Sequence, residues 1–168
     1  MKLLRKWWAR LLHEPSVPAA DAGVEHPRRP RVLVDEAMLA YLRSNAPEPS
    51  QAALEEVLVR SRRVRVFRGG AVAGKPLKEE VVLDTDEVEA ISSLREALRI
   101  TDGPAGHCMC HGDMTIELME PSGSRLAVIG VHHGRTIRWN EWKDDAELIE
   151  RGRLLDWLTR HGVAYPWM

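Results

Sequence analysis

Cysteine and histidine are concentrated in two short segments of the chain, GHCMCHGD at 106–113 and VHHG at 131–134. The first segment contains both cysteines of the chain, Cys108 and Cys110, one residue apart. Thiolates and imidazoles are preferred ligands of Zn²⁺, and a thiol beside an imidazole becomes a nucleophile when it is deprotonated. The residue types therefore allow four interpretations: a metal site, a nucleophile, a disulfide, or a strand of small residues without a chemical role.

The spacing of these residues argues against two familiar motifs. The segment C-M-C-H is one residue shorter than the C-x-x-C-H haem attachment motif, and it lacks the C-x-x-C spacing of thioredoxin-like proteins. A mixed set of two thiolates with one or two imidazoles suits a zinc ion. The competing interpretation is that the cysteines are small buried side chains and the histidines meet solvent at strand ends. The candidate metal ligands are Cys108, Cys110, His111, His132 and His133.

The same cluster allows a cysteine-dependent enzyme. Cys108 or Cys110 would attack, and His132 or His133 would act as the base, with Asp113 orienting it. No G-x-S-x-G or papain-like signature surrounds these residues, and no helix N-terminus is predicted behind them to form an oxyanion hole. A disulfide within the segment is disfavoured, because two extended residues at this spacing hold their thiols beyond normal bond geometry. We therefore favour a non-enzymatic binding or accessory protein with a zinc site, and keep the enzyme as the alternative.

A β-hairpin is expected to bring the two segments together. The run MTIELME alternates apolar and polar residues, which predicts a strand. The segment PSGS at 121–124 predicts a turn, and RLAVIGVHH predicts a second strand. Pairing Leu118 with Val128 and Ile116 with Gly130 keeps the apolar residues on one face. In that register the CMCHG and HHG segments converge at the same end of the hairpin.

The elements around the hairpin predict an α+β fold with a small, largely antiparallel sheet and flanking helices. Strands are expected over 63–67 and 81–84 and in TIRW after the hairpin. One helix is expected after Asp35, and another after Ser50 with Leu54, Val57 and Leu58 facing inward. A further helix is expected to start between Asp84 and Asp86, with Glu89 completing a capping box and Val88 in its core face, and the last to start at Asp144 and Asp145.

Three stretches of the chain carry a resemblance to a known family. The stretches GHCMCHGDMTIEL, RLAVIGVHHGRTIRW and LLDWLTRHGV resemble a family of uncharacterised bacterial proteins. In that family a cysteine-rich strand leads into a hairpin that ends in H-H-G-x-[ST]-[IL]-R-W. The resemblance covers roughly residues 80–165. It implies a bacterial cytosolic protein with the same order of strand, hairpin and helix.

Two further groups of residues allow a binding role. Arg138 and Trp139 follow the hairpin, and they are expected either to form a patch that binds a carboxylate or phosphate or to pack in the core. The run RSRRVRVFR carries five arginines, and alternation places Arg63 and Arg65 on the solvent side of a strand at a sheet edge. Because only Phe67 accompanies these arginines and the chain as a whole is slightly acidic, nucleic acid is not expected as a partner.

Charge is distributed unevenly along the 168 residues. The chain has 24 basic and 25 acidic residues, a net charge of −1, whereas MKLLRKWWARLL has four bases and no acid. This segment predicts an amphipathic helix over 1–12, whose apolar face would contact a protein partner or an anionic membrane surface. That face includes Leu4, Trp7, Trp8 and Leu11. A proline-rich linker over 13–30 and a globular domain over 31–168 are expected to follow.

The expected location is the cytoplasm. No apolar run approaches the roughly 18 residues of a membrane span, and the first segment lacks the features of a secretory signal. Two cysteines do not form a disulfide framework, so reduced thiols are expected. If the basic helix binds lipid, the protein would be peripheral to the inner face of the membrane.

Overall fold

The computed structural model describes residues 45–166, which form an α+β domain. Over this range the helices are α3 (Gln51–Arg60), α4 (Val88–Ala97) and α5 (Arg151–Arg160). The predicted fold class is confirmed. None of the helices within residues 45–166 is long and apolar enough to cross a membrane. The helix expected after Asp35 and the predictions for residues 1–12 and 13–30, Leu4, Trp7, Trp8 and Leu11 included, lie outside the described residues.

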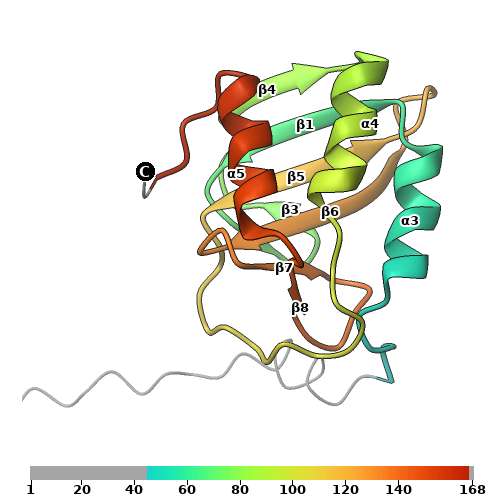
Figure 1. The fold of residues 1–168 in the computed structure, drawn as a ribbon, viewed down its shortest axis with the longest axis vertical. Coiled ribbons are helices and arrows are strands. Elements are labelled where there is room, and N and C mark those ends of the chain that lie inside the picture. Colours follow the sequence, from blue (N-terminus) through green and yellow to red (C-terminus); the bar gives the residue numbers. More distant parts are fainter. Residues whose placement is uncertain (1–44, 167–168) are drawn as a thin grey trace, which may run out of the picture. The chain divides into compact units, whose positions relative to one another are not determined.

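A six-stranded antiparallel sheet runs through the domain in the order β4-β1-β5-β6-β7-β8 (Figure 1). The long central strands are β1 (Arg63–Arg68), β5 (Met114–Met119) and β6 (Arg125–His132), and the shorter ones are β4 (Val81–Thr85), β7 (Thr136–Trp139) and β8 (Ala146–Glu147). A separate two-stranded ribbon joins β2 (Ala71–Val72) to β3 (Lys75–Pro76).

The hydrophobic core lies between the sheet and the helices, where α4 and α5 cross one face of the sheet (Figure 1). Side chains on that face alternate with residues on the other, as the pleat of a strand requires. Trp157 of α5 is fully buried and its indole N–H donates to the carbonyl of Ala90 in α4, at 2.9 Å. The core cluster contains from the three central strands the side chains Val64, Val66, Met114, Ile116, Leu118, Ile129 and Val131.

Helix α3 begins where the sequence predicts, but its cap is a different residue. Helix α3 follows Ser50 and buries Leu54, Val57 and Leu58 as predicted, but the cap comes from Asp102, whose carboxylate accepts from the Gln51 backbone N–H at 2.6 Å. A nonlocal carboxylate has taken the place of the local hydroxyl.

The capping box expected for α4 is wrong. The helix begins at Val88 and its N-cap is Glu87, so Asp86 and Glu89 are one residue out of phase with a capping box. Val88, expected in the core face, is the first residue of the helix and is 80 % exposed, and Ala90 contributes to the buried face instead. Asp84 remains in β4, where its carboxylate accepts two hydrogen bonds from the guanidinium of Arg63.

The hairpin of β5 and β6 forms as predicted, but its register is shifted by one residue. Leu118 pairs with Ala127 and Ile116 with Ile129, and the ladder has an irregularity between Leu118 and Met119. A one-residue shift reverses the face of every side chain in the strand. The shift places the branched Ile129 in the core and leaves His132 on the opposite face of the sheet, still at the end predicted from the sequence.

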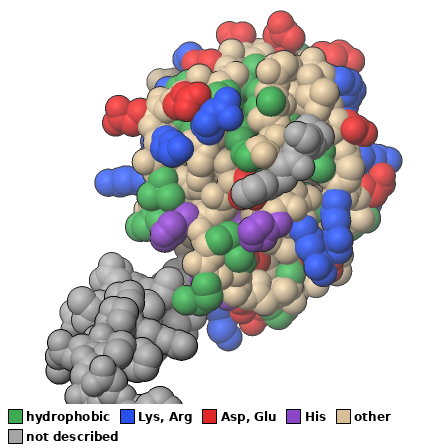
Figure 2. All heavy atoms as spheres, turned by 90° about the vertical axis from the view of Figure 1, so that its left-hand side faces the viewer, with side chains coloured by type: hydrophobic (Ala, Val, Ile, Leu, Met, Phe, Trp, Pro, Cys, Tyr) green, Lys and Arg blue, Asp and Glu red, His purple; other side chains and the backbone are tan. Residues whose placement is uncertain are grey.

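The arginine-rich strand β1 was predicted to lie at a sheet edge, and this prediction is wrong. The strand lies between β4 and β5. Its outward-facing arginines form ion pairs: Arg63 with Asp84 at 2.6 Å, and Arg65 with the buried Glu117 at 3.2 Å. Acidic and basic side chains are likewise interspersed over the face of the molecule shown in Figure 2. Paired in this way, the two arginines carry little unbalanced positive charge.

Candidate metal centre

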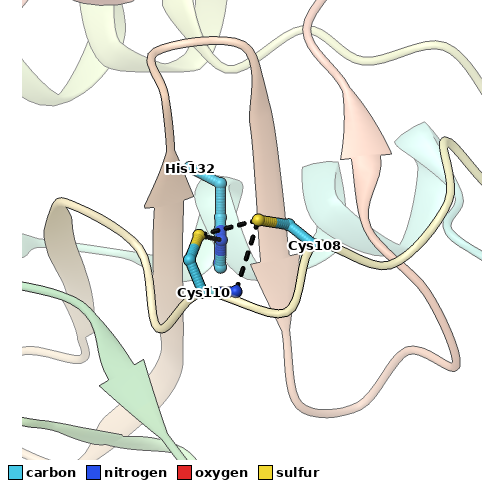
Figure 3. Close-up of side chains that lie close together, drawn as sticks. All are labelled: Cys108, Cys110 and His132. Atoms are coloured by element: carbon cyan, nitrogen blue, oxygen red, sulfur yellow. Dashed lines mark hydrogen bonds between the residues drawn. The ribbon is translucent and has the colours of Figure 1, made fainter. Parts of the chain in front are cut away.

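The cysteines lie in an irregular loop over 106–113 that leads into β5, and not in an extended strand. Glycines at 106 and 112 have φ values of 85° and 90°, which turn the backbone at both ends of the loop. As a result the Sγ atoms of Cys108 and Cys110 point toward one another and lie 2.8 Å apart (Figure 3). The sequence analysis disfavoured a disulfide on the assumption of an extended backbone; the cysteines are indeed free, but the backbone is curved and the sulfurs are closer than an extended segment would hold them.

His132 is the last residue of β6 and faces the two thiols from the sheet (Figure 3). Its Nδ1 lies 3.1 Å from the Sγ of Cys110, and the side chain is 1 % exposed. Burial, together with the positive charge of Arg138, lowers the pKa of His132 to about 4. The ring is therefore neutral at pH 7, which is the form in which an imidazole binds a metal ion.

His133 approaches the same thiols from the solvent side. Its Nε2 lies 3.5 Å from the Sγ of Cys108 and 3.4 Å from that of Cys110, while its side chain is 59 % exposed. The residue has a φ of 52° at the first position of the β6–β7 turn, a left-handed conformation that most residues with a side chain avoid. Its backbone N–H donates to the carboxylate of Asp113 at 2.6 Å, which fixes this conformation.

The two thiols differ electrostatically. The pKa of Cys108 is lowered, first because the Cys110 thiol hydrogen-bonds to it and further because His133 is close. The pKa of Cys110 is raised, first by burial and then by the neighbouring Cys108. Of the two sulfurs, Cys108 therefore carries the negative charge more readily.

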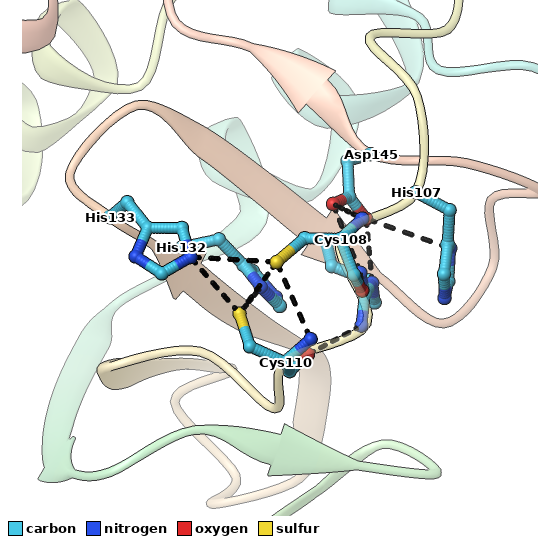
Figure 4. Close-up of polar contacts among 7 residues, drawn as sticks. His107, Cys108, Cys110, His132, His133 and Asp145 are labelled. Carbon is cyan, nitrogen blue, oxygen red and sulfur yellow. Dashed lines mark hydrogen bonds and ion pairs between the residues drawn. The ribbon is translucent and has the colours of Figure 1, made fainter. Parts of the chain in front are cut away.

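An ion pair between Arg138 and Asp145 holds the cysteine loop, and Figure 4 shows Asp145 beside Cys108. The guanidinium of Arg138 donates to the carbonyls of Cys108 and Cys110, at 2.5 and 3.2 Å, and to both carboxylate oxygens of Asp145, at 2.6 and 3.0 Å. Asp145 in turn accepts from the backbone N–H of Cys108 at 3.1 Å. Both charged side chains are largely buried, so the loop is fixed by charge-assisted hydrogen bonds.

The other side of the loop lies against the chain between β1 and β2. The backbone N–H of Ala71 donates to the carbonyl of His111, and that of Gly69 donates to the carbonyl of Asp113, both at 2.9 Å. Between these two bonds, Gly70 lies so close to the loop that a Cβ atom would be 1.7 Å from the carbonyl oxygen of His111. Only glycine allows the two backbones to approach this closely.

Replacing Gly70 with alanine is expected to lower the free energy of unfolding by about 1–3 kcal/mol, because backbone has to move to admit the methyl group. Urea denaturation of the full-length protein measures this change. Gly152→Ala in α5 is the matched control, since a Cβ there meets nothing within 4 Å, and it should leave stability unchanged or slightly higher. Equal effects of the two substitutions would contradict the close approach at Gly70.

Two residues that support the site were not identified from the sequence: Asp145 was assigned another role, and Tyr165 was missed. Asp145 was expected to start a helix, but α5 begins at Arg151 and Asp145 is buried beside Arg138. The hydroxyl of Tyr165 donates to Asp113 and accepts from the backbone N–H of Gly134, both at 2.6 Å. Burial and then the Asp113 carboxylate raise the pKa of Tyr165. No local pattern marks either residue, because their partners lie 7 to 52 positions away.

The remaining candidate residues have other surroundings. His111 is exposed, and within residues 45–166 the group of potential ligands consists of Cys108, Cys110 and His132. Trp139 is 8 % exposed and packs edge-on against Trp142, with ring centroids 5.3 Å apart, which agrees with the core interpretation. The guanidinium of Arg138 is engaged with the loop, so a carboxylate or phosphate ligand for it stays a prediction.

Comparisons with protein-family models, curated proteins and solved structures found no match to this chain. The resemblance to the bacterial family described above therefore stays a prediction.

The geometry is also compatible with the alternative function, a cysteine-dependent enzyme. The ring of His133 lies between the thiol of Cys108 and the carboxylate of Asp113. Its Nε2 is 3.5 Å from the sulfur and its Nδ1 is 3.9 Å from a carboxylate oxygen. A histidine placed in this way acts as a base for a thiol. This alternative stays a prediction, whereas the ligand group of Cys108, Cys110 and His132 is a feature of the structure.

Proposed function

We propose that this protein binds a zinc ion through Cys108, Cys110 and His132 and serves as a non-enzymatic binding or accessory protein. The observation that supports this most strongly is the convergence of two thiols and a buried imidazole, whose donor atoms all lie within 4.8 Å of one another. Thiolate and neutral imidazole form the usual donor set of tetrahedral zinc sites.

The spacing of the donors needs only a small adjustment to accept the ion. Two sulfurs bound to one tetrahedral zinc at about 2.3 Å lie roughly 3.7 Å apart. The sulfurs of Cys108 and Cys110, now 2.8 Å apart, would separate by about 1 Å through side-chain rotation. The backbone of the loop keeps its bonds to Arg138 and Ala71 during this movement.

His133 supplies the fourth ligand in this proposal. Its Nε2 already lies at nearly equal distances from both sulfurs, and its strained backbone keeps the ring there. Because this ring is exposed and His132 is buried, the ion would be closed off from the sheet side and replaceable from the solvent side. Two thiolates balance the charge of Zn²⁺, and the Arg138 guanidinium stabilises the loop carbonyls beside them.

Zinc content of the reduced, untagged, full-length protein tests the proposal. We expect one tightly held zinc ion per chain, and a loss of at least tenfold in affinity for His132→Ala. His111→Ala is the matched control, since the exposed His111 side chain lies outside the ligand group, and it should retain the ion. A native protein that binds no zinc from a buffered solution, or equal loss in both histidine variants, would refute the proposal.

A further inference from the structure

The two thiols are arranged as a reactive pair as well as a ligand pair. Both cysteines are free, and their sulfurs lie 2.8 Å apart, whereas a disulfide bond is about 2.05 Å long. Each thiol is therefore the nearest nucleophile to any bond that forms on its neighbour.

The pair is open to small molecules from solvent. Both cysteines are only half-buried, and Met109 between them is 71 % exposed. His133, which lies over the thiols, is itself exposed. A small disulfide can therefore reach the sulfurs, while the backbone of the loop remains fixed by Arg138 and by Asp145, which Figure 4 shows beside Cys108.

We propose that the metal-free protein exchanges thiols with small-molecule disulfides through Cys108 and Cys110. One cysteine thiolate attacks a disulfide RSSR, forming a mixed disulfide and releasing one RS⁻. The second cysteine thiolate attacks the protein sulfur of that mixed disulfide, forming the Cys108–Cys110 bond and releasing the second RS⁻. The protein loses two electrons and two protons, and RSSR gains them as two thiols, so the reaction is balanced.

The oxidised form should be easy to reduce. A disulfide across a single intervening residue closes a very short loop, so it gains little stability from restricting the unfolded chain. Strained or exposed disulfides have more oxidising potentials than structural ones and exchange readily. The reaction is therefore reversible by small thiols.

Metal binding and exchange exclude one another, an inference that rests on the proposed zinc function. A sulfur in the Cys108–Cys110 bond is no longer a thiolate, so oxidation removes two ligands at once. Conversely, thiolates that coordinate zinc are not available to attack a disulfide. Oxidation would release the ion, and reduction would restore its site.

Mass spectrometry of the chelator-treated full-length protein after incubation with oxidised glutathione tests the exchange. The native protein is expected to lose two hydrogen atoms in mass and to carry no stable adduct. Cys108→Ser and Cys110→Ser should each stop at a mixed disulfide with one glutathione. Met109→Leu, which keeps both thiols and their spacing, is the matched control and should behave as the native protein does.

Two results would overturn the exchange: a native protein that stays fully reduced, or one that accumulates two stable glutathione adducts. The same incubation with added zinc separates this inference from the proposed function. If zinc binds but the metal-free protein forms no disulfide, the exchange fails and the zinc site stands. If the disulfide forms equally fast with zinc present, the exchange stands and the zinc site fails.

Discussion

Zinc is expected to raise the melting temperature of the native protein on the order of 10 °C, and to leave that of the variant Cys108→Ser/Cys110→Ser unchanged. An ion present at a thousand times its dissociation constant stabilises the folded state by about 4 kcal/mol. For a domain of this size, each kcal/mol shifts the melting temperature by about 2–4 °C. The site hardly exists in the unfolded chain, so binding energy appears directly as stability.

The comparison is best made by scanning calorimetry with and without zinc on reduced protein. In the absence of metal, the double variant should unfold close to the native protein, since both cysteines are only half-buried and serine is nearly isosteric. Met109→Leu controls for substitution within the loop and should respond to zinc as the native protein does. An equal response of native protein and double variant would show that the stabilising ion binds elsewhere.

The second large effect is expected from Arg138→Leu, which should lower the free energy of unfolding by about 3–5 kcal/mol. This substitution leaves the carboxylate of Asp145, 1 % exposed, without its guanidinium partner. It also removes the hydrogen bonds to the carbonyls of Cys108 and Cys110, so zinc affinity should fall about 10–100-fold. Urea denaturation and competitive zinc titration measure the two effects separately.

Two further variants make this prediction specific. Arg138→Leu combined with Asp145→Asn removes both charges and should recover part of the lost stability. Arg135→Leu breaks an exposed ion pair with Glu147 and should cost at most about 1 kcal/mol without changing zinc affinity. If Arg138→Leu is no more harmful than Arg135→Leu, the buried pair does not hold the loop.

The sequence predicted where the site lies because the rule involved is local. Alternation in MTIELME and RLAVIGVHH, with a turn between them, is enough to return His132 to the start of β5, next to the cysteines. The exact register was wrong because the strands alternate in either register, and only packing on the core face selects the one that buries Ile129 beside Ile116. The error left the position of the site intact, since it changes the face of a residue and not the end of the strand.

The internal geometry of the site could not be predicted from the sequence, because the contacts that determine it are between residues far apart in the chain. The curvature of the cysteine loop depends on contacts with Gly70 and Arg138, which lie 41 and 28 positions away from the loop residues they contact. Asp145 resembles a helix-start residue until its partner is known. The αL conformation of His133, which aims its ring at the thiols, is set by a backbone bond to Asp113.

Zinc X-ray absorption spectroscopy of the loaded, reduced full-length protein tests the metal centre most directly, because it identifies the atoms bound to the ion. With Cys108, Cys110, His132 and His133 as ligands, the spectrum should fit two sulfurs at about 2.3 Å and two nitrogens at about 2.0–2.1 Å. A first shell of nitrogen and oxygen alone, without sulfur, would contradict the site proposed for this protein.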